Sequence, residues 1–169
     1  MPGIASTHSG SEGGDRLKAL DFLLGDWIGD GQGDTFTFHE EASFRWVLDE
    51  RALAYHSRSF ADGSGFIHCE EGYLMYANRE QRLLGLFIYG DGLIELAEAR
   101  LEVDGGLTLD TWQIIAVPRG KSYRSIHRRL TPMLEGFRHE IVLTLGPEGP
   151  FRHAESRLTR VRSSGLVTP

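Results

Sequence analysis

Most of the chain alternates between apolar and polar residues with a period close to two, which is the period of a β-strand. The alternation begins after Gly25, where Trp27, Phe36, Phe38 and Phe44 fall among polar residues. Groups of Gly, Asp, Asn and Pro interrupt it at regular intervals and read as tight turns. The segments between these turns predict strands near 26–32, 35–47, 51–60, 66–76, 82–89, 93–103, 107–116, 121–131, 136–145 and 151–162.

Consecutive strands joined by short turns predict an antiparallel meander. A flat sheet of this length would leave two exposed edges, whereas closure of the sheet removes them. We therefore expect an all-β fold, a closed antiparallel up-and-down β-barrel of about ten strands. A barrel of about eight to ten strands can enclose a cavity for a small ligand.

One short helix is expected before the strands. Over residues 15–24, Leu17, Leu20 and Leu24 recur at helical spacing, Asp15 can cap the start and Gly25 can end the helix. We expect this helix to close one mouth of the barrel. Trp27 follows the helix directly, so its ring should pack beneath the leucines and form the lower core with them.

Length and composition indicate one domain, since 169 residues suit a single core. Residues 1–14 and 163–169 are rich in Gly and Ser, so we expect disordered tails around a barrel domain over residues 15–162. The single cysteine, Cys69, excludes an internal disulfide. A net charge of −6 and the lack of a secretory signal or long apolar run predict a soluble cytoplasmic protein that binds neither nucleic acid nor membrane.

Polar residues inside the predicted strands are the candidates for chemistry. Glu40–Glu41 and Glu70–Glu71 are adjacent carboxylates, and on a strand only one of each pair can face inward. We expect one of each pair in solvent and the other in a polar cluster. Alternation puts Arg124 and Arg128 on the same strand face as Ile126. An inward arginine could hold a carboxylate, but we take a solvated face as the simpler interpretation of these arginines.

The histidines do not predict a metal site built from protein ligands alone. There are seven of them, and none form an i, i+4 pair of the kind that binds zinc on a helix. No Gly-x-Ser-x-Gly motif is present, which leaves nucleophilic catalysis without support. A surface or hydrogen-bonded role is therefore the simplest interpretation of each histidine taken alone.

Five segments in order along the chain resemble the nitrobindins, haem-binding β-barrels of the calycin type that are related to lipocalins and fatty-acid-binding proteins. The opening Gly25-Asp26-Trp27-Ile28-Gly29-Asp30-Gly31-Gln32-Gly33 is similar to the G-x-W-x-G-x-G-x-G of that family. The others are similar to its aromatic-x-Glu-Glu, H-x-E-x-G-aromatic, G-x-V-E-V and closing H-x-x-x-R-L-x-R-V motifs, and lie at 38–41, 68–73, 92–96 and 153–161. After Gly33 the chain is several residues shorter than the family pattern.

The resemblance implies a haem b cofactor in the cavity. By position, His153 would supply the nitrogen that ligates ferric iron, and His68 would lie on the open side of the haem. Alternation would put Phe151, His153 and Glu155 on one face, so Phe151 should flank the porphyrin. Glu155 would then need a partner such as Arg129 or Arg157.

Nitric oxide binding and isomerisation of peroxynitrite to nitrate are the activities that the resemblance implies, which would make the chain a peroxynitrite isomerase if haem is bound. An alternative is a non-catalytic carrier or sensor of another hydrophobic small molecule in the same cavity. A third is a barrel that acts through its surface alone. The sequence leaves open whether the protein is a monomer or a homodimer.

Overall fold

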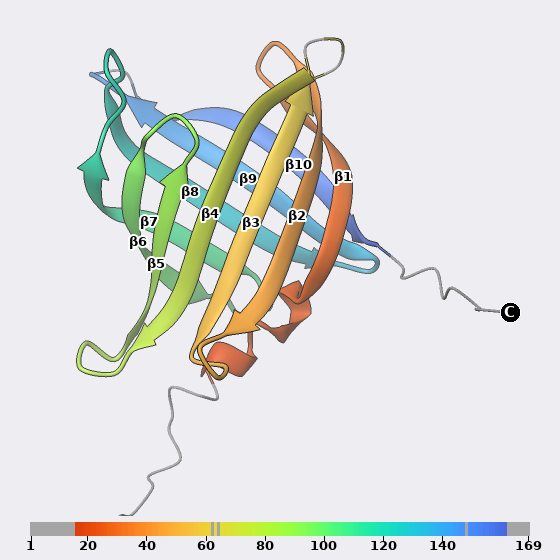
Figure 1. Ribbon diagram of the computed structural model, residues 1–169, viewed down its shortest axis with the longest axis vertical. Coiled ribbons are helices and arrows are strands. Elements are labelled where there is room, and N and C mark those ends of the chain that lie inside the picture. The colour runs from red at the N-terminus through yellow and green to blue at the C-terminus, as the bar shows by residue number, and fades with distance from the viewer. Residues whose placement is uncertain (1–15, 62, 64, 148, 162–169) are drawn as a thin grey trace, which may run out of the picture.

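The chain folds into a single closed barrel of ten antiparallel strands (Figure 1). The structure, a computed structural model, describes residues 16–161 apart from 62, 64 and 148. The tails expected at 1–14 and 163–169 lie outside the described residues. The strands are β1 (Gly25–Gly33), β2 (Thr37–Val47), β3 (Ala52–Ala61), β4 (Gly65–Ala77), β5 (Arg82–Tyr89), β6 (Ile94–Leu101), β7 (Leu107–Ala116), β8 (Tyr123–Met133), β9 (Gly136–Leu145) and β10 (Phe151–Arg160).

Each strand pairs with the next one along the chain, and β1 pairs with β10 to close the barrel. The closing register runs from Trp27 opposite Arg160 to Gly33 opposite Ala154. The closed up-and-down topology confirms the fold class predicted from the spacing of the turns. It also leaves no open sheet edge among the ten strands, which is the physical advantage of closure.

Two strands begin two residues later than the sequence pattern predicted. A hydrogen bond of 2.8 Å from the Gly33 amide to the Phe36 carbonyl makes a turn, so β2 begins at Thr37 and not at residue 35. The Lys121 amide donates a hydrogen bond of 3.1 Å to the Pro118 carbonyl, which keeps residue 121 in the preceding turn. Strand β8 therefore begins at Tyr123. In both cases the backbone turn uses residues that the pattern had assigned to a strand.

The N-terminal segment packs across one end of the barrel. Residues 16–18 are helical, and a 3-10 helix, η1 (Asp21–Leu23), follows. Leu17 and Leu20 are buried as expected, but Leu23 is fully buried in place of Leu24, because the tighter helix turns Leu23 inward.

Trp27 joins this segment to the barrel core. The indole Nε1 donates a hydrogen bond of 2.6 Å to the Leu23 carbonyl, and the ring meets the Phe137 ring edge-on at 4.9 Å between centroids. The guanidinium of Arg160 lies 4.7 Å from the centre of the indole. The expected lower core of Trp27 with Leu17 and Leu20 is confirmed, and Leu23 takes the place expected for Leu24.

The glycines of β1 allow close packing. A Cβ atom on Gly31 would lie 2.3 Å from the Phe38 ring, and one on Gly29 would lie 1.8 Å from the Arg157 carbonyl oxygen. Real Cβ atoms do not approach backbone atoms so closely, so Gly29 requires glycine, whereas at Gly31 the Phe38 ring would have to move. The two glycines therefore leave room beside β1 for the Arg157 carbonyl of β10 and the Phe38 ring of β2.

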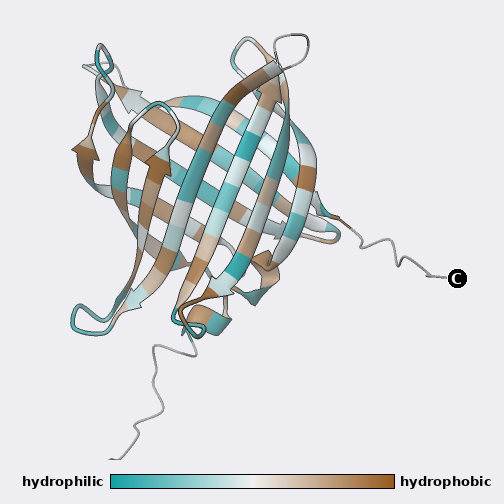
Figure 2. Ribbon diagram, in the orientation of Figure 1, coloured by the Kyte–Doolittle hydropathy of each residue, from teal (hydrophilic) through white to brown (hydrophobic). Residues whose placement is uncertain are grey.

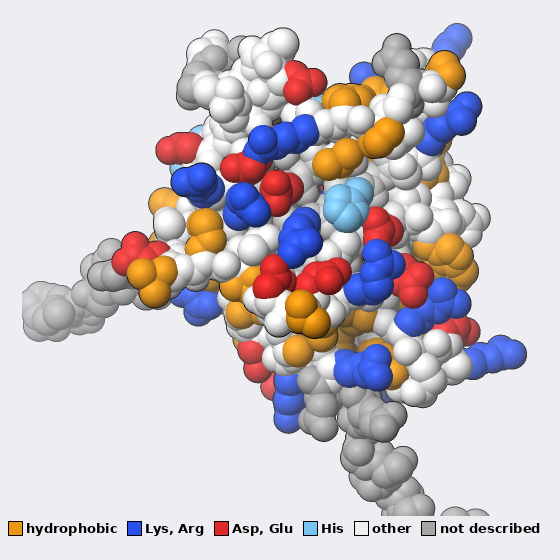
Figure 3. Space-filling view, turned by 180° about the vertical axis from the view of Figure 1, so that it is seen from behind, with side chains coloured by type: hydrophobic (Ala, Val, Ile, Leu, Met, Phe, Trp, Pro, Cys, Tyr) orange, Lys and Arg blue, Asp and Glu red, His pale blue; other side chains and the backbone are white. Residues whose placement is uncertain are grey.

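Hydrophobic and hydrophilic residues alternate along the strands, so brown and teal segments are interspersed over the barrel wall in Figure 2. The rear of the molecule carries charged side chains of both signs (Figure 3). Ion pairs on the outer wall include Arg129 with Asp104 at 2.7 Å and Arg138 with Glu140 at 3.2 Å. Among the described residues, no helix has the length and apolar character to cross a membrane.

Candidate ligand cavity

The barrel encloses a cavity of about 130 Å³ between the core and the open mouth. Its lining combines apolar side chains with buried acids, bases and hydroxyls. The apolar members include Phe36, Phe38, Ile67, Leu93, Ile126, Ile141 and Leu143. The polar members include Glu40, Ser57, Ser59, His68, Glu70, Arg128, His139, His153 and Ser156.

A β-bulge at His153 lets two consecutive residues, His153 and Ala154, line this cavity. The register between β10 and β9 passes from Arg152 opposite Val142 to Ala154 opposite Ile141, which leaves His153 as an extra residue. His153 lines the cavity and is half-buried. Burial lowers the pKa of His153, and Asp34 and His68 act on it in opposite directions. A neutral imidazole, which can ligate a metal, is therefore favoured.

The same bulge overturns the expected placement of Glu155. Beyond it, Ala154, Ser156 and Leu158 face inward and are buried, so Glu155 faces outward. Glu155 forms an ion pair with Arg152, and not with Arg129 or Arg157. Simple alternation from His153 was wrong because a bulge shifts the phase of a strand by one residue.

Phe151 lies before the bulge and packs against the hydrophobic core. Its ring meets the His153 ring edge-on, with 6.3 Å between the centroids and an angle of 84°. Phe151 is therefore a direct neighbour of His153, although it does not line the cavity itself.

His68 lines the cavity from β4, on a different part of the wall from His153 on β10. Its Nε2 lies 3.8 Å from Glu70 Oε2, and its ring lies 5.7 Å from that of Tyr89. Burial alone would lower the pKa of His68, but Glu70 and, more weakly, Asp91 and Glu40 raise it above its ordinary value. Burial alone would raise the pKa of Glu70, but His68 and Arg128 lower it to about 2.

A second buried carboxylate joins four strands. Glu40 on β2 accepts hydrogen bonds from Ser156 Oγ at 2.5 Å and Ser57 Oγ at 3.1 Å, and lies 3.4 Å from His139 Nδ1. Burial would raise the pKa of Glu40, but the hydrogen bond and charge of His139 lower it. We call these four residues the Glu40 cluster.

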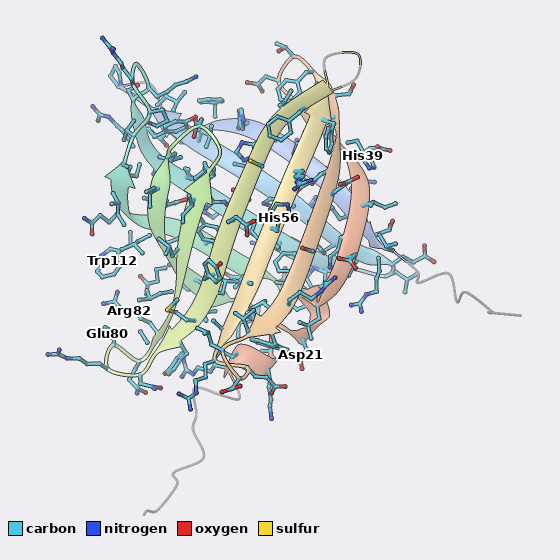
Figure 4. The ribbon with its side chains drawn as sticks, viewed as in Figure 1. Asp21, His39, His56, Glu80, Arg82 and Trp112 are labelled. Carbon is cyan, nitrogen blue, oxygen red and sulfur yellow. The ribbon has the colours of Figure 1, made fainter. Side chains whose placement is uncertain are left out.

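The carboxylate pairs therefore divide as the sequence indicated. Glu40 and Glu70 are both 4% exposed, whereas Glu41 and Glu71 face solvent. Glu71 Oε1 lies 2.7 Å from His56 Nδ1 on the outside of the barrel. Figure 4 labels His56, on β3, and His39, on the neighbouring strand β2. The prediction of one inward and one outward member of each pair is confirmed.

Arg128 corrects the expectation of a solvated arginine face. It is 1% exposed, and its Nη2 donates to Glu95 Oε2 at 2.8 Å. Its guanidinium carbon lies 4.5 Å from the centre of the Phe87 ring, a cation–π contact. The position is inward because Arg128 shares the face of Ile126, as alternation required.

Glu95 shares its carboxyl group among several partners. Tyr89 and Arg128 both donate to Oε2 at 2.8 Å, and Oε1 contacts the Thr111 hydroxyl. Burial raises the pKa of Glu95 to about 8, with the Thr111 bond opposing and Glu70 adding to the rise. The Thr111 hydroxyl donates to Oε1, so both carboxyl oxygens of Glu95 have donors. Arg128 forms a buried ion pair with Glu95, and its charge also lowers the pKa of Glu70.

Sequence reasoning missed the buried Arg128–Glu95 pair and His139. Alternation from Ile126 and from Phe137 could have placed Arg128 and His139 inside. No local signal could pair either with its partner, because the partners lie 33 and 99 residues away along the chain.

The donor groups of the cavity suit a haem group. Iron in haem needs one neutral imidazole from the protein, which His153 can supply, and a porphyrin needs the apolar wall that Phe36, Phe38 and Ile67 give. The described residues contain no cluster of three or more His, Cys, Asp or Glu that could hold a bare metal ion. At about 130 Å³ the enclosed space is below the roughly 300–1,000 Å³ of drug-sized ligand pockets, so a porphyrin would extend into the mouth.

Fold and cavity together define a small-ligand-binding β-barrel with a histidine available for haem iron. Residues 16–160 match the family model of the THAP4-like, heme-binding beta-barrel domain. The chain belongs to this family, which confirms the nitrobindin-like resemblance and the expectation of a haem cofactor.

Two individual proteins are similar to the chain. A peroxynitrite isomerase of Nocardia farcinica (strain IFM 10152) is 37% identical over 101 residues, which are 56% of this chain and 59% of that relative. The crystal structure of Rv2717c from M. tuberculosis has a TM-score of 0.71 and is 22% identical. It covers 86% of this chain and 97% of that chain, a likeness that shows the shared fold.

Proposed function

We propose that His153 ligates ferric haem b in the barrel cavity and that the loaded protein reacts with nitric oxide or peroxynitrite. The observation that carries the proposal is that the half-buried His153 lines the cavity of a haem-family barrel. The 37% identical peroxynitrite isomerase supports the reaction class. The match spans 59% of that relative, so the activity is part of the proposal.

The residues around His153 have separate tasks in this proposal. Phe151 packs edge-on against the imidazole and restricts its rotation. His68 on β4 would face a bound haem across the cavity from His153, and Phe36 and Ile67 would give the porphyrin apolar contacts. Haem, when bound, supplies an iron atom that binds small nitrogen oxides.

Haemin titration into the purified protein tests ligation. The parent should give a shifted, saturable absorption band that His153→Ala lacks. His39→Ala is the matched control, because His39 is exposed on the outer wall beside Asp30 and should leave the band unchanged. Identical spectra for the parent and His153→Ala would refute the ligand assignment.

Stopped-flow decay of peroxynitrite tests the reaction. The haem-loaded parent should speed the decay and increase the yield of nitrate relative to the haem-free protein. Haem loading without any change in decay rate would refute the reaction class. If the parent binds no haem at all, the carrier of another hydrophobic small molecule becomes the better account. The cytoplasmic location and the choice between monomer and homodimer stay predictions.

A further inference from the structure

Two buried side chains at the inner end of the cavity carry polar atoms without a hydrogen-bond partner. Among the described residues, these atoms are the Tyr55 hydroxyl and the Nε and Nη1 atoms of Arg128. Arg128 is 1% exposed and Tyr55 is 5% exposed, so neither is open to bulk water. A buried donor without a partner destabilises a fold, and a bound acceptor would offset that cost. We call Tyr55 and Arg128 the floor pair.

The floor pair lies where two cavities adjoin. Arg128 and His139 line both the main cavity and a smaller one of about 10 Å³ within the core. Tyr55 lines the smaller cavity, and Ser57, two residues along the same face of β3, lines the main one. A space of this size holds about one water-sized group. A single oxygen atom of a molecule in the main cavity therefore fits beside the floor pair.

Both members of the floor pair are fixed and able to donate. The Tyr55 ring stacks on the Phe44 ring with 4.7 Å between centroids, and Nη2 of Arg128 is bound to its carboxylate partner. Burial raises the pKa of Tyr55 well above its ordinary value, and the charge of Glu70 adds to the rise, so the hydroxyl keeps its hydrogen. Glu70 and Ser57 lie near this hydroxyl without meeting it in hydrogen-bond geometry.

The charges near the floor pair favour an uncharged ligand. Each of the three buried acids already has a basic partner: Arg128 with Glu95 at 2.8 Å, His139 with Glu40 at 3.4 Å and His68 with Glu70 at 3.8 Å. An added anion would therefore be a buried charge without a counter-charge of its own. A carbonyl oxygen can accept two hydrogen bonds and carries no net charge.

The main cavity limits the size of the rest of the ligand. Its enclosed space of about 130 Å³ is close to the roughly 150 Å³ of a protein cavity that holds benzene. Phe38, Leu93 and Ile126 give it an apolar wall. A small apolar ring or short chain that carries one carbonyl group suits both the space and the wall.

We propose that the barrel binds a small apolar ketone or aldehyde, whose carbonyl oxygen accepts hydrogen bonds from Tyr55 and Arg128 at the inner end of the cavity. This is a second class of ligand, and its binding does not depend on haem. Haem would occupy the same main cavity, so the tests use the haem-free protein.

Acetophenone is the probe, because it joins a benzene ring to one carbonyl group. NMR titration of the haem-free parent should show saturable binding. α-Methylstyrene has the same shape with a CH₂ group in place of the oxygen, and should bind about tenfold or more weakly because it cannot accept from Arg128 and Tyr55. Benzoate, which is charged, should also bind more weakly than acetophenone. No acetophenone binding, or equal or tighter binding of either comparison compound, would overturn the proposal.

Tyr55→Phe separates ligand binding from stability. The variant keeps the ring that stacks on Phe44 and removes a hydroxyl without a partner, so it should melt at or above the temperature of the parent. Its affinity for acetophenone should fall by about two- to tenfold, whereas its affinity for α-methylstyrene should not change. Tyr73→Phe is the matched control, because Tyr73 on β4 is 37% exposed on the outside of the barrel, and it should match the parent.

Two further readouts decide the role of each donor. The carbonyl stretching band of bound acetophenone should lie at lower wavenumber in the parent than in Tyr55→Phe, because a hydrogen bond weakens the C=O bond. The preference for acetophenone that remains in Tyr55→Phe should report the Arg128 donors, and its complete loss would overturn their role. Equal acetophenone affinity and an equal band in the parent and Tyr55→Phe would mean that the smaller cavity holds a buried water only, and would overturn the proposal.

The outcomes are independent of the proposed function. A parent that binds haemin but not acetophenone would overturn this inference alone. A parent that binds acetophenone but not haemin would overturn haem ligation by His153 and leave this inference in place.

Discussion

Trp27→Ala should unfold the closed end of the barrel at a much lower temperature than the parent. The indole is 4% exposed, packs against Phe137 and donates to the Leu23 carbonyl. Truncation of a buried Trp costs about 3–5 kcal/mol. For a chain of this size about 1 kcal/mol lowers Tm by about 2–4 °C, so the expected fall is about 6–20 °C.

Thermal melts followed by circular dichroism and urea titrations measure this loss. Trp27→Phe separates the two contributions, because it keeps a ring but leaves the Leu23 carbonyl without its donor; we expect a loss of about 1–3 kcal/mol. Trp112→Ala is the control. Trp112 is 52% exposed and lies over Arg82 on the outer wall (Figure 4), so its loss should cost about 1 kcal/mol or less. A Trp27→Ala protein that melts with the parent would refute the packing of the N-terminal segment.

Three further predictions concern the barrel interior. Gly31→Ala should destabilise by about 1–3 kcal/mol in urea, because its Cβ would lie 2.3 Å from the Phe38 ring; wild-type stability would contradict this. Glu70 should stabilise the fold above about pH 4.5 and lose that effect as the pH falls to about 2, since its pKa is lowered from 4.5 to about 2. At about 1.4 kcal/mol per pH unit the full loss is about 3 kcal/mol, of which about 2 kcal/mol has gone by pH 3. Urea midpoints at pH 3 and pH 6 should show this loss in the parent and a smaller one in Glu70→Gln. Arg128→Met should cost about 3–5 kcal/mol in urea at pH 7, because it leaves the buried carboxyl groups of Glu95 and Glu70 without their counter-charge; a neutral effect would show that Arg128 does not balance them.

The fold could be predicted from the sequence because turns and alternation are local signals. The spacing of turns predicted ten strands, and closure followed from the cost of free edges. The same alternation placed one glutamate of each adjacent pair inside the barrel, as Glu40 and Glu70 show. Leu23 in place of Leu24 shows the limit of a helical pattern where the last turn tightens to a 3-10 helix.

The interior of the cavity was less accessible to sequence reasoning. The bulge at His153 depends on the pairing register between β10 and β9, and no residue pattern within β10 predicts it. Ser156 reaches Glu40 across 116 residues of sequence, so the polar cluster exists only after the barrel has closed. The motif at 153–161 identified the histidine, whereas the bulge explains how His153 and Glu155 face opposite sides.

Imidazole rescue of His153→Gly tests the central claim, that His153 provides the nitrogen for haem iron. The variant should lose the absorption band of the haemin-loaded parent, and free imidazole should restore it by occupying the space of the lost ring. His39→Gly, which changes an exposed histidine, should keep the parent band without imidazole. A His153→Gly protein that shows the full parent band without imidazole would contradict the claim.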